Sequence, residues 1–161
     1  MIRTATSDDT PAIAAIMGAF VRSSTVSFSA LEKSAADWHA ILQARRAAGR
    51  EFWVACEAGK ITGFATYDQF RPNDGYRHTM EHTIYLDPAV KGQGTGRALL
   101  QLVEEHARAA GAHAMIGVMD ADNEGSIGFH LRMGYEEQGR LRRIGRKFDR
   151  WLDAVMLVKY L

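Results

Sequence analysis

A turn with a glycine at every second position, within residues 91–97, constrains the fold of this chain more than any other feature. It ends an apolar segment expected to be a strand, residues 81–86, and opens an apolar segment expected to be a helix. Glycine lets a backbone approach a ligand closely, and the N–H groups of a first helical turn have no internal acceptor. The turn therefore predicts a phosphate site at the start of a helix, with a plain strand-to-helix turn as the alternative.

Spacing excludes two common phosphate-binding motifs. The Walker motif requires Lys and then Ser or Thr after its last glycine, whereas Gly96 is followed by Arg97 and Ala98. The dinucleotide fingerprint requires a third glycine at position 97 and normally follows the first strand of a domain. A turn of the form Arg/Gln-x-x-Gly-x-Gly/Ala remains. It resembles the pyrophosphate loop with which the GCN5-related N-acetyltransferases (GNAT) hold acetyl-CoA, with Lys91 in place of the usual Arg or Gln.

Length and composition indicate one globular domain, residues 1–161, because an apolar content of 47% is ordinary for such proteins. The formal net charge of +1 gives no general attraction to nucleic acid or to a membrane surface. The single cysteine, Cys56, cannot form an internal disulfide, and its apolar neighbours predict a buried structural thiol. With no recognisable signal sequence or membrane-spanning stretch, we expect a cytoplasmic protein.

Strand and helix patterns alternate along the whole chain and favour a single α/β domain around a mixed sheet. The expected strands are residues 2–5, 52–57, 61–67, 81–86 and 114–119, and the last two strands are expected within residues 134–135 and 140–161. The expected helices begin near residue 7 and at residues 35–48, 95–110 and 123–133. The apolar stripe expected on the third of these helices is Leu99, Leu102, Val103, His106 and Ala110.

Three further blocks resemble one branch of the same family, the phosphinothricin and methionine sulfoximine acetyltransferases. Residues 76–85 resemble that branch's Tyr/Phe-Arg-x-Thr-Val-Glu-His-Ser-Val-Tyr, and residues 145–153 resemble its Gly-x-Lys-Phe-Gly-Arg-Trp-Leu-Asp. Residues 123–135 resemble the helix and strand after the fifth strand, with His130 where most of the family has tyrosine. The resemblance implies the family's α/β (α+β) fold, a mixed, mostly antiparallel central sheet flanked by helices.

Acetyl transfer to an amine requires loss of a proton from the ammonium, a donor for the oxyanion and departure of a thiolate. The resemblance implies that Glu81 is the general base, with a pKa that burial would raise. It implies that a backbone N–H of Tyr85 or Leu86 stabilises the oxyanion. It also implies that Asn123 bonds the pantetheine arm and that His130 protonates the thiolate. The alternatives are an exposed carboxylate at position 81 and a packing histidine at position 130.

The resemblance also implies two sets of binding residues. Acetyl-CoA is expected to contact Ile84, Tyr85, Leu86, Lys91, Gly92, Gln93, Gly94, Thr95, Gly96, Arg97, Asn123 and Ser126. The amine substrate is expected to contact Phe28, Phe70, Arg71, Asp74, Gly75, Tyr76, Arg77, Lys147, Phe148 and Trp151. The aromatic members predict a small closed pocket, and the cations among them could pair with a carboxylate or phosphinate, although ordinary surface charge is the alternative.

Other charged and polar groups carry weaker predictions. His78 and His82 are four apart and are expected to share a strand face, but no cysteine or further acid completes a zinc site, so no metal is expected. The basic residues between 140 and 150 alternate with Leu141, Ile144 and Phe148. That pattern predicts strands with one solvated face in preference to a nucleic-acid site.

The sequence therefore predicts an acetyl-CoA-dependent N-acetyltransferase that transfers directly to the α-amine of a small amino acid or analogue. The resemblance implies phosphinothricin, methionine sulfoximine and methionine sulfone as substrates, and it alone implies a homodimer. Departures at Phe70 (usually Trp) and Asp149 (usually Gly) leave the substrate less constrained than the reaction. The alternatives are a GNAT enzyme for a polyamine or a protein N-terminus, and a non-catalytic acyl-CoA-binding module. No nucleic-acid or membrane partner is expected.

Overall fold

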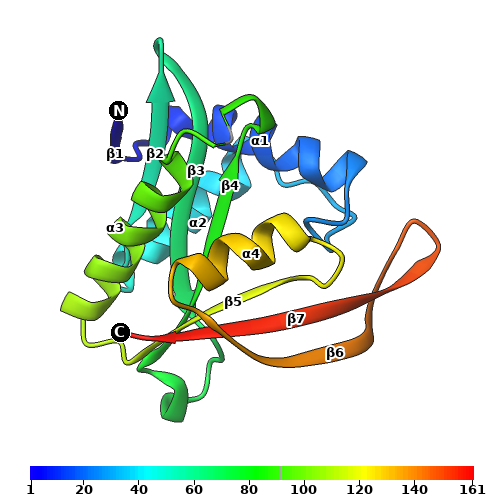
Figure 1. Cartoon of the computed structure of the whole chain (residues 1–161). Helices are drawn as coiled ribbons and strands as arrows, with labels where there is room; N and C mark the ends of the chain where they lie inside the picture. The colour runs from blue at the N-terminus through cyan, green and yellow to red at the C-terminus, as the bar shows by residue number, and fades with distance from the viewer. Residues whose placement is uncertain (91) are drawn as a thin grey trace.

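In the computed structural model, which describes residues 1–90 and 92–161, a seven-stranded sheet forms the centre of the molecule (Figure 1). The strand order is β1-β2-β3-β4-β5-β7-β6, and every neighbouring pair is antiparallel except β4 and β5. The strands are β1 (Ile2–Thr4), β2 (Phe52–Glu57), β3 (Lys60–Gln69), β4 (Thr79–Leu86), β5 (Ala114–Asp120), β6 (Glu136–Lys147) and β7 (Arg150–Tyr160).

Helices cover both faces of this sheet. On one face, Trp38 and Leu42 pack with Phe52 and Phe64 of the sheet. The first helix packs on the same face through Ile13. On the other face, a larger core joins the third and fourth helices to the sheet through residues such as Ile127 and the fully buried Leu99. The helices are α1 (Thr10–Ser23), α2 (Ala35–Ala47), α3 (Thr95–Ala109) and α4 (Glu124–Arg132), with short 3₁₀ turns at Ser7–Asp9, Asp74–Tyr76 and Pro88–Val90. The expected fold class and element order are confirmed.

Local sequence signals explain several element boundaries. Ser34 caps α2: its hydroxyl accepts a hydrogen bond from the Asp37 backbone N–H, while the Asp37 carboxylate accepts one from the Ser34 N–H. The hairpin turn between β2 and β3 has two residues with positive φ, Ala58 (47°) and Gly59 (79°). This is the backbone of a two-residue turn whose twist matches that of the strands.

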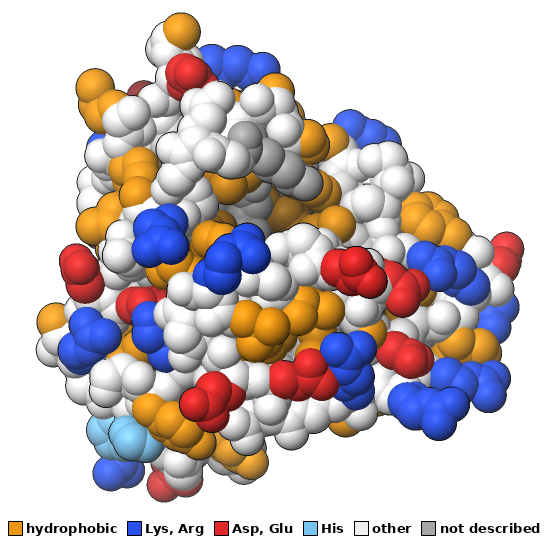
Figure 2. Space-filling model, in the orientation of Figure 1, with side chains coloured by type: hydrophobic (Ala, Val, Ile, Leu, Met, Phe, Trp, Pro, Cys, Tyr) orange, Lys and Arg blue, Asp and Glu red, His pale blue; other side chains and the backbone are white. Residues whose placement is uncertain are grey.

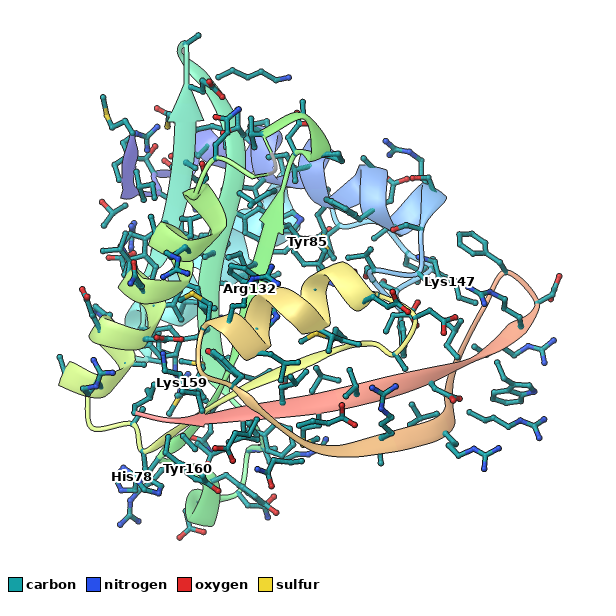
Figure 3. The ribbon with its side chains drawn as sticks, viewed as in Figure 1. His78, Tyr85, Arg132, Lys147, Lys159 and Tyr160 are labelled. Carbon is teal, nitrogen blue, oxygen red and sulfur yellow. The ribbon has the colours of Figure 1, made fainter. Side chains whose placement is uncertain are left out.

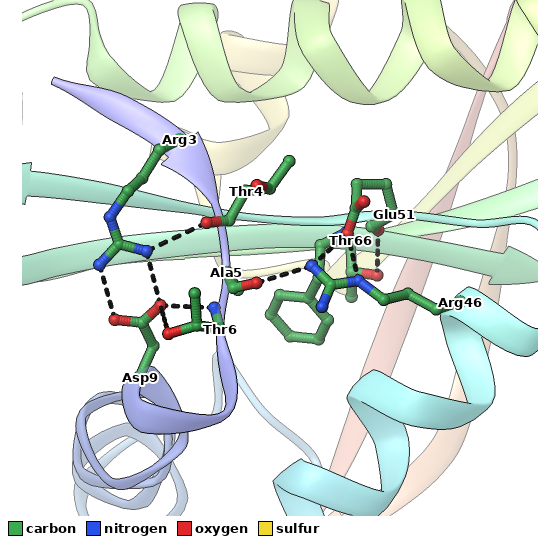
Figure 4. Close-up of polar contacts among 9 residues, drawn as sticks. Arg3, Thr4, Ala5, Thr6, Asp9, Arg46, Glu51 and Thr66 are labelled. Carbon is green, nitrogen blue, oxygen red and sulfur yellow. Dashed lines mark hydrogen bonds and ion pairs between the residues drawn. The ribbon is translucent and has the colours of Figure 1, made fainter.

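Polar contacts fasten the N-terminal strand to the body of the domain (Figure 4). The Arg3 guanidinium donates to both oxygens of the Asp9 carboxylate, at 2.7 and 2.8 Å. This pairing lowers the pKa of Asp9, which lies below its usual range although burial opposes the shift. On the other side of the chain, Arg46 donates to the Ala5 carbonyl and to the Glu51 carboxylate.

The sequence prediction for α3 is correct in position and only partly correct in orientation. Leu99 and Val103 are buried as expected, but the rest of the buried stripe consists of Leu100, Glu104 and Ala107. His106 lies at the margin, where its Nδ1 is 2.8 Å from the Tyr67 hydroxyl. The buried Glu104 was not expected in the stripe, and it is there because its carboxylate accepts a hydrogen bond from Lys159 of β7 at 2.6 Å.

The parallel pair β4 and β5 forms a fork. The two strands are in register only at Thr79↔Ala114, Met80↔Met115 and Glu81↔Ile116. Beyond that point β4 continues to pair with β3, whereas β5 continues to pair with β7. The strands therefore separate after Glu81 and leave one edge of β4 without a strand partner among the described residues.

The hairpin formed by β6 and β7 extends beyond the rest of the sheet, and basic side chains gather over this end of the molecule (Figures 1 and 2). The prediction of one solvated face is wrong for β6, because nearly every residue from Glu136 to Arg146 is exposed on whichever face it lies. Leu141, Ile144 and Phe148 are 45%, 60% and 55% exposed. The cause is tertiary: the connection between α1 and α2 packs on the hairpin at Gly145 and Lys147, and these three apolar side chains stay exposed beyond that contact.

Candidate active site

A cleft of about 460 Å³ opens between the free edge of β4, the start of α3 and the helix α4. Figure 2 shows this part of the surface hollowed, with hydrophobic side chains at the floor. Nine residues predicted to bind acetyl-CoA line it: Ile84, Tyr85, Leu86, Gly92, Gly94, Gly96, Arg97, Asn123 and Ser126. The predicted Gln93 and Thr95 belong to the same turn but do not line the cleft, and Lys91 lies outside the described residues.

The glycine turn has the geometry of an anion site. Gly92 and Gly94 have φ values of 85° and 82°, which side-chain-bearing residues rarely adopt, and space is open around both. Gly94 is the N-cap of α3, so the first N–H groups of that helix face this end of the cleft. The Arg97 side chain also lines the cleft. Together these groups supply the amides and the cation that a diphosphate requires.

The free edge of β4 presents backbone groups to the cleft, and the strand register decides which ones. Asp87 donates its N–H to Thr62 of β3, and Thr79 accepts from Phe70, so odd-numbered residues of β4 bond to β3. Hydrogen-bonding direction alternates along a strand, so Ile84 and Leu86 direct their N–H and C=O groups into the fork. Of the two predicted oxyanion donors, Leu86 therefore fits and Tyr85 does not.

The first turn of α4 forms the opposite wall. Asn123 is the N-cap, and its Oδ1 accepts a hydrogen bond from the Ser126 N–H at 3.1 Å. Its side-chain amide N–H groups have no described partner and lie beside the cleft, as a residue that bonds the pantetheine arm requires. Sequence reasoning missed Phe20, Val26, Gly125, Phe129, Arg132 and Met133, which also line the cleft.

His130 lines the cleft and is almost completely buried, at 2% exposed. Its Nδ1 lies 2.7 Å from the Ser126 carbonyl oxygen, and its Nε2 lies 3.1 Å from Nε2 of His82. Burial lowers the pKa of both imidazoles, that of His82 to about 3, with the nearby His130 adding to the effect. Both rings are therefore neutral near pH 7. The predicted proton transfer from His130 would have to use the N–H that it now shares with Ser126.

Glu81 lies on the other face of the sheet from His82 and His130. Side chains alternate along β4, which places Glu81 on the same face as Tyr85, whose ring contacts Phe20 of α1 at a centroid distance of 5.1 Å. The Glu81 carboxylate is half-buried and has no hydrogen-bond donor among the described residues. Burial raises its pKa, as predicted, and the positive charge of Arg71 partly opposes this shift.

The residues predicted around the amine substrate lie in three separate places, so one chain does not form the predicted closed pocket. Phe70, Arg71 and Tyr76 lie together after β3. The Arg71 guanidinium is 4.8 Å from the centroid of the Phe70 ring, and the centroids of the Phe70 and Tyr76 rings are 5.9 Å apart. Asp74, Gly75 and Arg77 belong to the same exposed turn.

The second group, Phe28 and Lys147, lies where the connection between α1 and α2 packs on the β6–β7 hairpin, and the third group lies at the hairpin tip. Phe28 packs so closely on Gly145 that a Cβ there would lie 2.5 Å from its ring. Lys147, labelled in Figure 3, is 5% exposed. Its Nζ donates to the carbonyls of Ser24 and Ser27, so the structure gives this ammonium a bridging contact in place of free access. Phe148 and Trp151 are more than half exposed at the hairpin tip.

Two other sequence predictions concern polar residues away from the cleft. Cys56 is half-buried and not fully buried, because it lies at the end of β2 beside the chain terminus. His78 precedes β4, where its Nδ1 lies 2.8 Å from the Gly111 carbonyl, so it does not share a strand face with the buried His82.

Across residues 1–90 and 92–161, no three His, Cys, Asp or Glu side chains gather as metal ligands. No helix in the described part of the chain is both long and apolar enough to cross a membrane.

The donor groups of the cleft fit acetyl-CoA. The first turn of α3 and Arg97 suit a diphosphate, the free edge of β4 suits the amides of a pantetheine arm, and Ile84 and Phe129 suit its methylene groups. A forked parallel pair with a glycine turn at the next helix thus defines an acyl-CoA-dependent transferase.

Comparison with known proteins agrees with this class. Residues 14–135 match the acetyltransferase (GNAT) family, and the chain belongs to that family. It is therefore an acetyltransferase, with acetyl-CoA as the acetyl donor.

Three relatives define its place in the family. The L-methionine sulfoximine/L-methionine sulfone acetyltransferase of Pseudomonas paraeruginosa is 38% identical over 157 residues, covering 97% of this chain and 91% of that protein. A phosphinothricin acetyltransferase of Sinorhizobium meliloti, solved with AcCoA, has a TM-score of 0.95 and 30% identity over 100% of this chain and 88% of that one. A structure described as a ribosomal-protein-alanine N-acetyltransferase of Brucella melitensis has a TM-score of 0.96 and 36% identity, covering 100% and 99%.

Proposed function

We propose that this enzyme acetylates the α-amine of a small amino acid or close analogue, with methionine sulfoximine, methionine sulfone and phosphinothricin as the first candidates. The observation that carries this proposal is the position of Glu81, a half-buried carboxylate without a described hydrogen-bond donor at the point where the fork opens. The near full-length similarity to enzymes named for these substrates supports it. A neighbouring cation, Arg71, suits the carboxylate of an amino acid.

In this proposal the two faces of the sheet have different tasks. Glu81 takes the proton from the ammonium on the α1 side, either directly or through a water. The N–H groups of Leu86 or Ile84 in the fork donate to the carbonyl oxygen of the thioester. His130 and Ser126 lie on the α4 side, where the thiol must depart. Transfer is direct in this proposal, because Ser126, the one hydroxyl among these groups, has no base to activate it: the nearby Nδ1 of His130, at 3.5 Å, carries a proton toward the Ser126 carbonyl.

Acetylation of a protein N-terminus is the second candidate, since the Brucella protein is described as a ribosomal-protein-alanine N-acetyltransferase. A peptide needs an open groove beside Glu81. In this chain the connection between α1 and α2 crosses the fork and is fastened on its far side: Thr25 donates to the buried Asp120 carboxylate at the end of β5, and Lys147 binds the same connection. This closed connection favours a small amine.

The test is a measurement of CoA release with acetyl-CoA and a panel of amines: the three candidate substrates, spermidine and a short peptide with an N-terminal alanine. Saturable turnover on the three candidates alone would support the proposal. Turnover only on the peptide or on spermidine would overturn the substrate while leaving the family unchanged. Binding of acetyl-CoA without turnover on any amine would support a non-catalytic acyl-CoA-binding protein.

We also propose that the protein is a cytoplasmic homodimer. The exposed apolar residues of the β6–β7 hairpin support the dimer, because Ile144, Phe148 and Trp151 form an uncovered surface of the kind that a second copy buries. The single thiol suits a reducing compartment. Sedimentation analysis of the wild type and of Ile144→Lys would test the dimer. A wild type that sediments as a monomer at micromolar concentration would overturn it.

A further inference from the structure

The imidazoles of His82 and His130 meet at the base of the fork, one register position beyond the last pair of β4 and β5. Their planes differ by only 6°, and their Nε2 atoms are 3.1 Å apart. Tyr135 closes the pair from the side, with its ring at 87° to one imidazole and 89° to the other. The pair is thus held in one geometry by packing on several sides.

Gly117 of β5 provides the space for this pair. A Cβ at that position would lie 2.8 Å from Nε2 of His82 and 3.4 Å from Cδ2 of His130. The φ of Gly117 is not in the left-handed region, so backbone conformation does not require glycine there. The requirement comes from the side chains, because the two rings occupy the volume where a methyl group would sit.

Hydrogen-bond chemistry fixes where the protons lie. The Ser126 carbonyl can only accept, so Nδ1 of His130 carries the proton in their 2.7 Å contact. A neutral imidazole carries one proton, so Nε2 of His130 is an acceptor, and Nε2 of His82 must donate to it. Nδ1 of His82 is then a bare acceptor, and this buried atom has no hydrogen-bond partner among the described residues.

We propose that His82 is a positioning residue for the transfer reaction: its Nε2–H bond holds His130 in the tautomer that keeps Nδ1–H directed toward the first turn of α4. The kinetic part of this inference rests on the proposed function. Ser126 lines the cleft beside that N–H, with its hydroxyl 3.5 Å from Nδ1. A donor edge beside the departing sulfur stabilises developing negative charge, whereas a lone pair there would repel it.

Removal of the His82 donor frees His130 to change tautomer. With its proton moved to Nε2, His130 would place the lone pair of Nδ1 against the Ser126 carbonyl oxygen, and the ring would have to rotate away. Glutamine has an amide nitrogen in nearly the position of histidine Nε2 and can replace the donor. Methionine has a similar volume and no donor. His82→Gln and His82→Met are therefore a matched pair that separates hydrogen bonding from packing.

The experiment has a spectroscopic arm and a kinetic arm. In ¹⁵N-labelled wild-type protein at pH 7, ring correlations should show His130 protonated at Nδ1 and His82 protonated at Nε2. His82→Met should lower kcat by about tenfold, equivalent to about 1.4 kcal/mol, and leave KM for acetyl-CoA within about twofold. His82→Gln should recover most of the loss, and His39→Gln, on the exposed face of α2, should match the wild type.

Two results would overturn the proposal: a wild-type His130 that is protonated at Nε2 or carries both protons at pH 7, or a His82→Met enzyme with unchanged kcat. If both variants fold poorly, the wild-type spectrum still decides the tautomer. The spectroscopic arm needs no amine substrate. A wild type inactive on every amine would therefore count against the proposed function and leave the positioning role to be decided by NMR.

Discussion

Glu81 and His82 are neighbours on β4, and their side chains leave opposite faces of the sheet at the level where β4 and β5 separate. One residue therefore faces the side on which the α1–α2 connection crosses the fork, and the other faces the side of α4 and the cleft. A strand is the simplest element that gives consecutive residues opposite faces, because its side chains alternate. A group that removes a proton and a group beside the leaving thiol can thus act on the two sides of one thioester.

Replacement of Glu81 by glutamine should reduce turnover far more than it reduces acetyl-CoA affinity. General-base catalysis contributes about 10²–10⁴-fold, so we expect a loss of kcat in that range near pH 7. The base acts in its deprotonated form, and burial raises the pKa of Glu81, so wild-type activity should increase with pH through a value above the ordinary carboxyl range. Glu81→Gln should lose this acid limb.

Steady-state kinetics from pH 5 to 9, with acetyl-CoA affinity measured separately by calorimetry, checks this prediction. Glu105→Gln, the same chemical change on the exposed face of α3, is the control. Its turnover and its acetyl-CoA affinity should both match those of the wild type. An equal loss of turnover and of acetyl-CoA affinity would show that Glu81 supports the structure of the fork and is not the base.

The histidine pair should make stability depend on pH in a window where few other groups titrate. Burial lowers the pKa of His82 to about 3 and lowers that of His130 as well. The unfolded chain, with an ordinary histidine pKa of about 6.5, then binds more protons than the folded one, so stability rises with pH. The stability of the folded chain is not reduced by this pair above about pH 6.5, and it decreases as the pH falls below that value.

We therefore expect the free energy of unfolding to fall between pH 6.5 and 5, with a slope approaching about 1.4 kcal/mol per pH unit from His82 and a further contribution of the same sign from His130. Urea titrations of the wild type and His82→Gln should differ in this slope by the contribution of one histidine. His39→Gln should keep the wild-type slope. Identical slopes for all three proteins would mean that the pair is not held neutral by burial.

The sequence was sufficient for the element order and the acetyl-CoA turn because both depend on short-range patterns. Glycine spacing, the Asn123 cap and the alternation around Glu81 are properties of a few consecutive residues. Glu81 and His130 were singled out by resemblance, and their roles stay predictions. The helical spacing of Ser126, Phe129, His130 and Met133 could also have identified the cleft-facing side of α4.

The remainder depended on long-range packing that no local pattern contains. Phe20 and Val26 reach the cleft from α1 and the connection after it, which follows only from how α1 packs on the sheet. Apolar residues are interspersed along β6 as in a half-buried strand, yet Leu141 and Ile144 are 45% and 60% exposed in the folded chain. Likewise, Lys147 looks like a surface cation in the sequence, and only the folded chain brings it to two carbonyls more than a hundred residues away.

Substitution of Gly94 by alanine should weaken acetyl-CoA binding through the backbone. Gly94 has a φ of 82°, a conformation that costs a residue with a Cβ about 1–2 kcal/mol. If the turn shifts to relieve this strain, the first N–H groups of α3 lose their alignment, and KM for acetyl-CoA should rise by about 5- to 30-fold. Gly139→Ala, in β6 with ordinary φ and open space, should bind acetyl-CoA as the wild type does. Unchanged affinity in Gly94→Ala would place the diphosphate elsewhere.

Replacement of Lys147 by methionine should loosen the α1–α2 connection and raise KM for the amine substrate. Lys147 is 5% exposed, and its ammonium donates to the Ser24 and Ser27 carbonyls, each at 2.7 Å, so its removal leaves two carbonyls without this donor. Hydrogen bonds that involve a charged group contribute about 1.5–3 kcal/mol each, and part of this should appear as lower stability.

The rest should appear in the kinetics, because the connection crosses the fork on the side of Glu81 and carries Val26 into the cleft. We expect KM for the amine to increase by about tenfold or more, equivalent to about 1.4 kcal/mol, and KM for acetyl-CoA to change less. Lys60→Met, which removes an exposed lysine of the β2–β3 hairpin, controls for the loss of one charge. If the two KM values rose together, or if neither changed, the connection would not shape the amine site, and the binding of Lys147 to it would matter only for folding.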